Sequence, residues 1–161
     1  MTGRTVNLGG GEVVPYPEPS SPAATTIGKA NVRRDTKPEI ALRSELHRRG
    51  RRFRKDLLVR FDGGRVHPDV VFTRRKVAVF VDGCFWHSCP IHGRMPKANP
   101  QYWQPKLQAN VARDRRVDAG LQLAGWTVVR IWEHDGIADA ADRVEEALDR
   151  HGGARPRYSG D

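Results

Sequence analysis

The chain has 161 residues, of which 38% are hydrophobic and 29% are charged, a balance typical of a globular domain and unlike that of a wholly disordered chain. No apolar run approaches the roughly 20 residues that a membrane span requires, and the first residues lack the basic and then apolar pattern of a secretory signal. We therefore expect a cytoplasmic protein without membrane contact. Two cysteines are too few for a disulfide scaffold.

Positive charge is concentrated in one half of the chain. Lysine and arginine exceed aspartate and glutamate by nine overall, and residues 33–76 alone hold 15 basic and 6 acidic side chains. A basic surface of this kind predicts a polyanionic partner, most simply nucleic acid. The alternative is a generally basic surface that has no such partner.

Both ends of the chain differ in composition from its middle. Residues 1–24 are rich in glycine, proline and serine, which disfavour helices and strands and leave little to bury. Residues 152–161 have a similar composition. We predict disordered tails at both ends and one working domain over residues 25–151.

The first predicted helix begins at a capping box. Thr36 and Glu39 have the spacing of that motif, Pro38 suits the first turn, and Gly50 ends the helix. A turn at residues 62–64 precedes two predicted strands, 70–72 and 76–81. The second strand is almost continuously apolar, as expected of a central strand that is covered on both faces.

The rest of the domain continues the alternation of elements. Residues 84–103 read as irregular, followed by a helix over 105–124, a strand over 126–132 and a last helix over 138–151. Strands that alternate with helices predict an α/β fold with a layered sheet.

The irregular segment holds a group of residues that can bind zinc. Cys84, Cys89 and His92 lie within nine residues, and thiolate and imidazole are the ligands that zinc prefers. His134, just after the third predicted strand, is the best candidate for a fourth ligand. The alternative is two unrelated cysteines, buried or reactive, and a surface histidine.

Two carboxylates mark the ends of the paired strands. Asp69 opens the first strand and Asp82 ends the second. Oxygen atoms placed in this way can hold a hard cation such as Mg²⁺, which can activate water and polarise a phosphodiester. An aspartate that simply opens a strand is the plainer alternative.

Large aromatic residues gather in the same polar region. Phe85 and Trp86 precede His87, and Tyr102 and Trp103 follow downstream. Such rings are either part of a core or wedges that enter between base pairs. His87 is either a general base or a neutral histidine with satisfied hydrogen bonds.

The helix predicted after this region carries polar residues with two possible roles. Asn110 and the charged run from Arg113 to Arg116 form either a face that grips phosphates or a solvated helix surface.

In their order along the chain, these residues resemble the very short patch repair (Vsr) endonucleases over about residues 25–135. The most specific part of the resemblance is the run from Gly83 to His87. The whole resemblance rests on Asp35–Glu39 with Leu42 and Arg43, Pro68–Phe72, Val79–His87, Tyr102–Trp103, Lys106, Asn110, Arg113–Asp114, Gly125–Trp126 and Trp132–Glu133.

The resemblance implies a fold like that of type II restriction endonucleases, with three layers, a central mixed sheet flanked by helices, and a structural zinc site. It implies magnesium-dependent phosphodiester hydrolysis that nicks one strand 5′ of the T in a T·G mismatch, the lesion left when 5-methylcytosine deaminates. Such a nick initiates very short patch repair. The expected partner is double-stranded DNA that contains the mismatch.

The resemblance also implies a setting for the enzyme. We expect a monomer associated with the bacterial nucleoid. Functional links to a cytosine-5 methyltransferase and to mismatch-repair proteins are expected as well.

The resemblance assigns roles to single residues. Asp69 and the backbone carbonyl of Val81 would hold Mg²⁺, His87 would help to activate the attacking water, and Glu39 would support the site. The residues that would contact DNA are an aromatic wedge and polar residues of the following helix: Phe85, Trp86, Trp103, Lys106, Asn110 and Arg113.

The sequence departs from the family pattern at two places. Cys84 matches a family zinc ligand, whereas cysteine and histidine have exchanged places in the rest of the set, which would be Cys89, His92 and His134. Asp82 stands where some members have a second active-site histidine. A carboxylate there could take a catalytic role by binding the metal or a water molecule.

Two rival functions stay open. One is a restriction-type nuclease that cuts a duplex without a mismatch, on the same fold. The other is a zinc module that binds DNA without catalysis. The joint presence of Asp69, Glu39 and His87 around one pair of predicted strands favours an enzyme.

Overall fold

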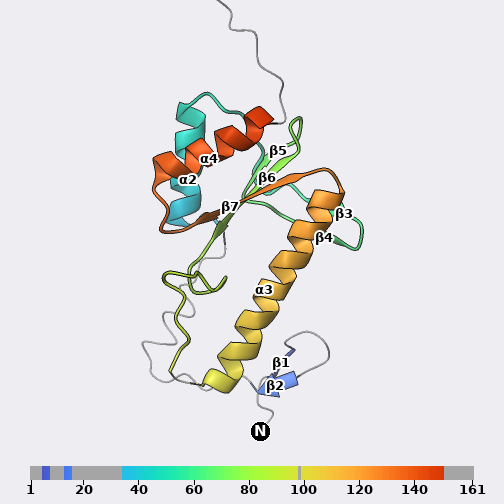
Figure 1. Ribbon diagram of the computed structural model, residues 1–161, viewed down its shortest axis with the longest axis vertical. Coiled ribbons are helices and arrows are strands. Elements are labelled where there is room, and N and C mark those ends of the chain that lie inside the picture. Colours follow the sequence, from blue (N-terminus) through green and yellow to red (C-terminus); the bar gives the residue numbers. More distant parts are fainter. Residues whose placement is uncertain (1–4, 8–12, 16–33, 98, 151–161) are drawn as a thin grey trace, which may run out of the picture. The chain divides into compact units, whose positions relative to one another are not determined.

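The structure is a computed structural model that describes residues 5–7, 13–15, 34–97 and 99–150. The chain divides into two compact units (Figure 1). Residues 37–82 with 117–161 make up the larger unit, and residues 1–36 with 83–116 make up the other. The helix α3 (Pro100–Leu123) contributes residues to both units.

A three-stranded mixed sheet forms the centre of the larger unit. Its order is β5 (Val70–Phe72), β6 (Val77–Asp82) and β7 (Thr127–Trp132). Strand β5 is antiparallel to β6, with Val70 opposite Val79, and β7 is parallel to β6, with Val129 opposite Val79. The predicted strands are therefore confirmed, and β6 is the buried central strand that its apolar sequence predicts.

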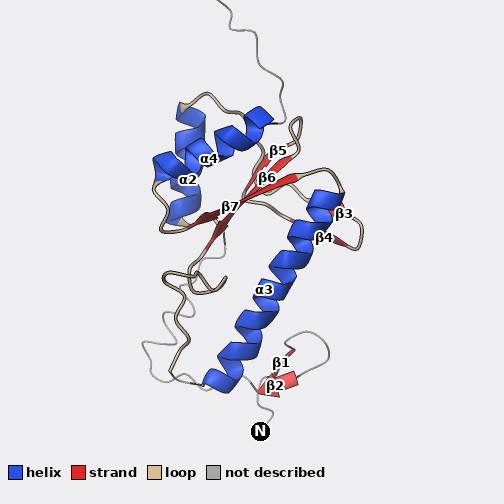
Figure 2. Ribbon diagram, in the orientation of Figure 1, coloured by secondary structure: helices blue, strands red, loops and turns tan. Residues whose placement is uncertain are grey.

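Two helices cover one face of this sheet: α2 (Lys37–Arg48) and α4 (Ile137–Arg150). Figure 2 shows both helices on the same side of the three strands. Leu42 and Leu46 of α2, Val144 of α4, and Val77 and Val79 of β6 are almost completely buried in one hydrophobic cluster. Burial of these side chains contributes roughly 1.5–3 kcal/mol each to folding.

The opposite face of the sheet packs against α3 and a β-hairpin. Ala78 and Phe80 of β6 share a second cluster with Leu121 of α3 and Val59. Because successive residues of a strand point to opposite faces, β6 supplies both clusters. The larger unit therefore has three layers around a mixed sheet, and the α/β class predicted from the sequence is confirmed.

The hairpin on this face was missed by the sequence prediction, which placed only a turn there. Strands β3 (Val59–Phe61) and β4 (Gly64–Val66) pair antiparallel around Asp62 and Gly63. Gly63 has φ +80°, which glycine adopts without steric cost. The ring of Phe61 lies against Gly120 of α3, at the place a Cβ atom would occupy. Each strand has only three residues, one of them an arginine, which is too short to show a strand period.

Helix α3 begins earlier than predicted. The sequence predicted a helix over 105–124, whereas the helix extends from Pro100 with Pro105 inside it. The amides of Tyr102 and Trp103 donate to the carbonyl of Asn99, which provides the first helical hydrogen bonds upstream of Pro105. The aromatic pair Tyr102 and Trp103 thus lies on a helix and not in an irregular segment.

Two short strands lie in the stretch predicted to be a tail. Strand β1 (Thr5–Asn7) pairs antiparallel with β2 (Val13–Pro15), so the prediction that this composition blocks strands was wrong here. Pro15 ends its strand, a position where the missing N–H is tolerated. The rest of the predicted tails, including residues 152–161, lies outside the described residues, and the domain limits 25–151 stay a prediction.

No described helix is both long enough and apolar enough to cross a membrane.

Candidate active site

Asp69 lies where β5 begins and is tied to β6 by two hydrogen bonds. Its backbone amide donates to the carbonyl of Val79 at 2.9 Å, and its Oδ2 accepts the backbone N–H of Val81 at 2.7 Å. The antiparallel pairing of β5 and β6 therefore holds the carboxylate beside Val81. The structure brings together the two residues for which the sequence predicted metal contacts.

The environment of Asp69 raises its pKa. The pKa of this carboxyl is raised from 3.8 to about 7, chiefly by burial and also by the nearby carboxylates of Glu39 and Asp82, against the hydrogen bond from Val81 and the charge of Arg43. The Glu39 and Asp82 residues are only 6% and 4% exposed. Three carboxyl groups in one poorly solvated region repel one another, and a divalent cation would relieve that repulsion.

Glu39 reaches this region from the first turn of α2. One of its carboxylate oxygens lies 3.7 Å from the guanidinium of Arg43, one helical turn later. The capping-box position predicted from sequence therefore places a carboxylate in the neighbourhood of Asp69.

Asp82 is held by an arginine of the neighbouring strand. The Nη1 atom of Arg130 on β7 donates to both carboxylate oxygens of Asp82, at 2.9 and 2.8 Å. The Nε and Nη2 atoms of the same guanidinium donate to Asp118 of α3, the shortest contact being 2.7 Å. The guanidinium also lies 4.8 Å from the ring centroid of Phe80. Arg130 thus links Asp82 at the end of β6 to Asp118 of α3, with one carboxylate on each side of its guanidinium.

In the other unit, His87 is paired with Asp114 of α3. The Nδ1 atom of His87 lies 2.6 Å from the Oδ2 atom of Asp114, and both side chains are half-buried. An aspartate that accepts the Nδ1–H of a neutral imidazole leaves Nε2 free of a proton, ready to accept one. This geometry suits the general-base role predicted for His87, and its partner Asp114 was named in the sequence analysis only as part of the family pattern.

Three aromatic rings of this unit form one cluster. The ring centroids of Phe85 and Trp86 are 5.0 Å apart, those of Phe85 and Trp103 5.3 Å, and those of Trp86 and Trp103 5.9 Å. All three residues are half-buried. Tyr102 is 4% exposed and belongs to the interior. Partial exposure leaves the cluster of Phe85, Trp86 and Trp103 able to meet a ligand.

Three polar residues predicted to contact DNA follow one face of α3. Lys106, Asn110 and Arg113 have the i, i+4, i+7 spacing of a single helix face. The ammonium group of Lys106 lies 5.6 Å from the Trp86 ring and 5.4 Å from the Trp103 ring. The side-chain amide of Asn110 donates to the carbonyl of Trp86 at 3.2 Å. The aromatic cluster and the polar helix face are therefore adjacent parts of one surface.

A compact cluster of potential metal ligands lies in the same unit. The ligand atoms of Cys84, Cys89 and His92 all lie within 4.8 Å of one another. Burial raises the pKa of the Cys89 thiol, but hydrogen bonds from the amides of His92 and Ile91 outweigh burial and leave the pKa below its ordinary value. A thiol that ionises readily suits zinc. His134 belongs to the other unit, where its ring stacks on Trp132 at 6.3 Å.

The two units thus gather the predicted residues in two groups. Glu39, Asp69, Val81 and Asp82 lie in one unit, and His87 with the aromatic, polar and cysteine residues lies in the other. The residues whose roles sequence analysis missed are Asp114, Asp118 and Arg130. In the sequence these residues are recognisable only as charged residues. Their charge does not show which residue they pair with, because the partners lie 12 to 48 positions away.

The amino-acid sequence is similar to a known protein family and to several known proteins. A family model described as DNA mismatch endonuclease Vsr matches residues 24–92. The type II nicking enzyme V.NaeI of Lentzea aerocolonigenes is 54% identical over 134 residues, which cover 83% of this chain and 81% of that protein.

Two further relatives match over shorter stretches. The type II nicking enzyme V.XorIIP of Xanthomonas oryzae is 47% identical over 105 residues, 62% of this chain and 71% of that protein. The DNA mismatch endonuclease Vsr of Escherichia coli is 35% identical over 88 residues, 49% of this chain and 56% of that protein.

Proposed function

Because this chain belongs to the Vsr family of DNA mismatch endonucleases, and is therefore a hydrolase that nicks DNA, we propose that its substrate is a duplex with a T·G mismatch. It nicks one strand on the 5′ side of the T. Such mismatches arise when 5-methylcytosine deaminates, and the nick initiates very short patch repair. The fold that supports this chemistry is the three-layer arrangement of type II restriction endonucleases, with the mixed sheet of β5, β6 and β7 at its centre.

The observation that carries the proposal is the carboxylate of Asp69, which has a pKa raised to about 7 beside Glu39 and Asp82. These residues fit a divalent cation, because it would favour the ionised form of each carboxyl group. Asp69 and the carbonyl of Val81 would hold Mg²⁺, with Glu39 as support. When bound, the ion supplies charge neutralisation at the scissile phosphate and a more acidic water.

Proton transfer belongs to His87. Its Nε2 atom takes the proton of the attacking water while Asp114 accepts the Nδ1–H and stabilises the imidazolium that forms.

Asp82 has a positioning role in this proposal. Both of its oxygens accept hydrogen bonds from Arg130, and a carboxylate so engaged is a poor base. It keeps the end of β6, and with it Val81, in place beside Asp69. A direct catalytic role for Asp82 is the weaker alternative.

Mismatch selection belongs to Phe85, Trp86 and Trp103. Unstacking a base step costs on the order of a few kcal/mol, and least at a mispaired base, so inserted rings favour a T·G step over a matched one. Lys106, Asn110 and Arg113 contact the DNA from the adjacent face of α3. Their amide, ammonium and guanidinium groups suit base edges and phosphates.

The cysteine cluster holds a structural zinc ion in this proposal. Cys84, Cys89 and His92 supply two thiolates and an imidazole, and His134 supplies the fourth ligand. Four protein ligands leave no open position for catalysis. Because Cys84 directly precedes Phe85 and Trp86 in the chain, zinc bound by Cys84 would help to hold the segment that carries the rings.

The test is strand-specific nicking of a duplex panel by the whole protein with Mg²⁺. T·G duplexes with randomised flanks are compared with matched T·A and methylated C·G duplexes of the same flanks. Preferential nicking 5′ of the mismatched T supports the proposal. Equal nicking of matched and mismatched duplexes refutes mismatch specificity.

A second candidate function is nicking of a defined sequence without a mismatch. The observation in its favour is that V.NaeI and V.XorIIP are named type II nicking enzymes. The same panel separates the two candidates, because sequence-specific nicking would depend on the flanks and not on the mismatch.

The proposed setting of the enzyme follows from this substrate. It acts as a monomer on nucleoid DNA in the cytoplasm. Its action is linked to a cytosine-5 methyltransferase, which creates the vulnerable base, and to mismatch-repair proteins. Sedimentation of the free protein and of its DNA complex tests the monomer.

A further inference from the structure

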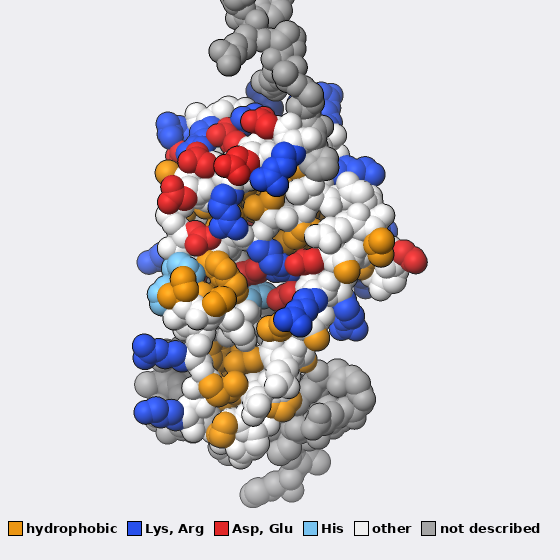
Figure 3. All heavy atoms as spheres, in the orientation of Figure 1, with side chains coloured by type: hydrophobic (Ala, Val, Ile, Leu, Met, Phe, Trp, Pro, Cys, Tyr) orange, Lys and Arg blue, Asp and Glu red, His pale blue; other side chains and the backbone are white. Residues whose placement is uncertain are grey.

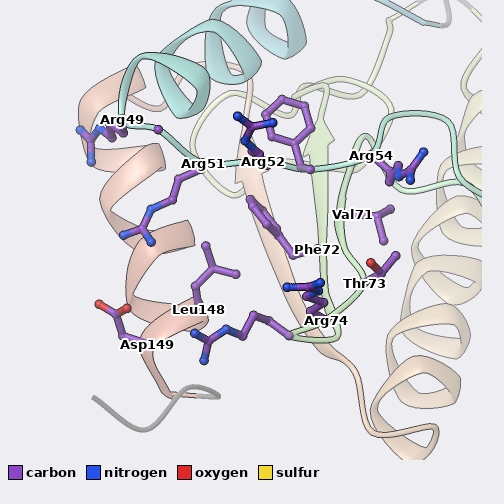
Figure 4. A pocket seen from close by; sticks show the side chains of 13 residues that line it. Arg49, Arg51, Arg52, Arg54, Val71, Phe72, Thr73, Arg74, Leu148 and Asp149 are labelled. Carbon is purple, nitrogen blue, oxygen red and sulfur yellow. The ribbon is translucent and has the colours of Figure 1, made fainter. Parts of the chain in front are cut away.

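A basic hollow of about 1050 Å³ lies in the larger unit (Figure 4). It surrounds the turn between β5 and β6 and the segment that follows α2. Strand β6 runs from this turn to Asp82, and six strand residues span roughly 17 Å. The hollow therefore lies at the end of the sheet that is opposite to Asp69. Its basic lining consists of six arginines: Arg49, Arg51, Arg52, Arg54, Arg74 and Arg75.

Two of these arginines form ion pairs with acidic residues of α4, which neutralise their charge. Arg49 pairs with Glu145 at 2.9 Å and also with Asp142, and Arg51 pairs with Glu145 at 2.6 Å. Figure 3 shows the resulting mixture of acidic and basic side chains over α2 and α4. These pairs contribute to the packing of the unit, and their guanidinium groups are occupied.

The other four arginines carry uncompensated charge. Within residues 34–97 and 99–150, the side chains of Arg52, Arg54, Arg74 and Arg75 form no ion pair. Asp149 is the single acidic residue of the lining. Four positive groups against one negative group leave a local surplus that attracts an anion.

The local fold holds two of these arginines in position. The amide and carbonyl of Arg54 pair with Val71 at 2.9 and 2.8 Å. Between Arg52 and Arg54, the ring of Phe53 stacks on His47 at 4.5 Å and meets Phe72 edge-on at 5.9 Å. Arg52 and Arg54 are exposed while Phe53 is half-buried, the alternation of an extended chain. Figure 4 shows Arg52, Arg54 and Arg74 around Phe72.

The lining of the hollow favours the phosphates of a nucleic acid over an acidic protein as its ligand. Of its apolar members, Val71, Phe72 and Leu148 are only 0%, 7% and 5% exposed and Phe53 is half-buried, so no fully exposed apolar side chain is offered to an acidic protein. Protein interfaces depend on such buried anchors. Phosphate contacts need only charge and hydrogen-bond donors, which guanidinium groups provide in pairs.

We propose that this hollow is a second DNA contact, which binds the phosphodiester backbone away from the nicked step. Arg52, Arg54, Arg74 and Arg75 hold phosphate oxygens there without reading base sequence. The proposal rests on the chain being a DNA endonuclease and is independent of which base pair it nicks beside. The contact would retain the enzyme on DNA and leave the chemistry at Asp69 unchanged.

The test compares two double variants of equal charge. R52Q/R74Q removes two arginines from the hollow, and R60Q/R65Q removes two exposed arginines from the β3–β4 hairpin. Binding of a fluorescent 40-bp matched duplex is measured by anisotropy over a series of salt concentrations. We expect R52Q/R74Q to lower the salt slope by up to about 1.8 and the affinity at 0.15 M salt by roughly threefold to thirtyfold. We expect a smaller effect for R60Q/R65Q.

The outcomes separate the possibilities. Equal losses in the two variants, or no loss in R52Q/R74Q, would overturn the proposal. Loss of binding to polyglutamate with unchanged DNA affinity would assign the hollow to an acidic protein instead and also overturn it. R54Q/R75Q provides a second pair if the first variant melts below wild type. Single-turnover nicking at saturating DNA should be the same in wild type and R52Q/R74Q, and this holds whichever duplex the enzyme prefers.

Discussion

Asp114 lies 2.6 Å from the Nδ1 atom of His87, through a contact that spans 27 positions of the chain. In the proposed mechanism, this pair keeps the imidazole proton on Nδ1 and leaves Nε2 to accept a proton. A base whose tautomer is fixed in advance needs no reorganisation when it takes a proton from the attacking water.

Replacement of Asp114 by asparagine tests this pair. The amide has the size of the carboxylate but can donate to Nδ1, which would put the imidazole proton on Nε2, the wrong tautomer. We expect single-turnover nicking of Asp114→Asn to fall by about 10²- to 10⁴-fold, with DNA affinity within about twofold of wild type. A rate equal to that of wild type would exclude Asp114 from the mechanism.

The raised pKa of Asp69 predicts a pH-dependent stability. A carboxyl group whose pKa rises from 3.8 to about 7 on folding favours the folded state below pH 4, and this contribution is lost as the pH rises to 7. Without magnesium, Asp69→Asn should therefore be more stable than wild type at pH 8, by about 1–2 kcal/mol once partial solvation of the side chain is allowed for. At pH 4 the two proteins should unfold alike.

Urea unfolding at pH 4 and pH 8 measures this difference. Added Mg²⁺ should stabilise wild type at pH 8 and leave Asp69→Asn unchanged, because the variant lacks the charged ligand of the proposed site. Nicking should be abolished in Asp69→Asn while DNA binding persists. Equal stabilisation of both proteins by Mg²⁺ would contradict the proposed metal site.

The pair of Asp82 and Arg130 predicts a strong energetic coupling. Arg130→Met keeps the apolar stem but leaves the buried carboxylate of Asp82 without its bidentate partner. Loss of one partner of a buried ion pair costs roughly 3 kcal/mol. Asp82→Asn in the same chain should recover part of that loss, since the uncompensated charge is gone. Additive losses in the double-mutant cycle would show that the two residues act independently.

The wedge proposal makes a prediction about selectivity. Trp86→Ala should reduce the ratio of nicking rates on T·G and T·A duplexes, because less ring surface replaces the lost base stacking. Trp86→Phe should keep most of the ratio, since an aromatic face remains. If Trp86→Ala keeps the wild-type ratio, selection of the mismatch must depend on other residues.

Metal analysis tests the cysteine cluster and its proposed fourth ligand. Purified wild type should contain about one zinc ion per chain, and Cys84→Ser should lose it together with thermal stability. His134→Ala should also lower zinc content. His67→Ala is the matched control, because His67 is an exposed histidine outside the cluster and its loss should leave zinc unchanged. A zinc-free wild type would remove the structural argument.

The sequence predicted those elements whose patterns are local. The boundaries of β5, β6, β7, α2 and α4 lie within one or two residues of the predictions, because apolar periods, a capping box and stop glycines are local signals. The sequence did not predict the β3–β4 hairpin, because its short strands carry Arg60 and Arg65 and are stabilised by packing on α3. Whether such short strands form depends on contacts between residues that are distant in the sequence.

The same distinction holds for the candidate site. Asp69 and His87 could be proposed from the sequence because they lie in recognisable motifs. Asp114 and Arg130 act through partners that only folding brings near. The arginines of the hollow were counted in the sequence as excess charge, but only the structure separates the paired Arg49 and Arg51 from the four that have no acidic partner among the described residues.

The pairing of β5 with β6 sets the position of the Asp69 carboxylate. Register places Val70 opposite Val79 and thereby Asp69 within reach of the Val81 amide. A slip by one position would carry every side chain of β5 to the other side of the sheet and separate Asp69 from Val81. During evolution or redesign, the turn at residues 73–76 can therefore change length or composition only where the phase of the two strands is preserved.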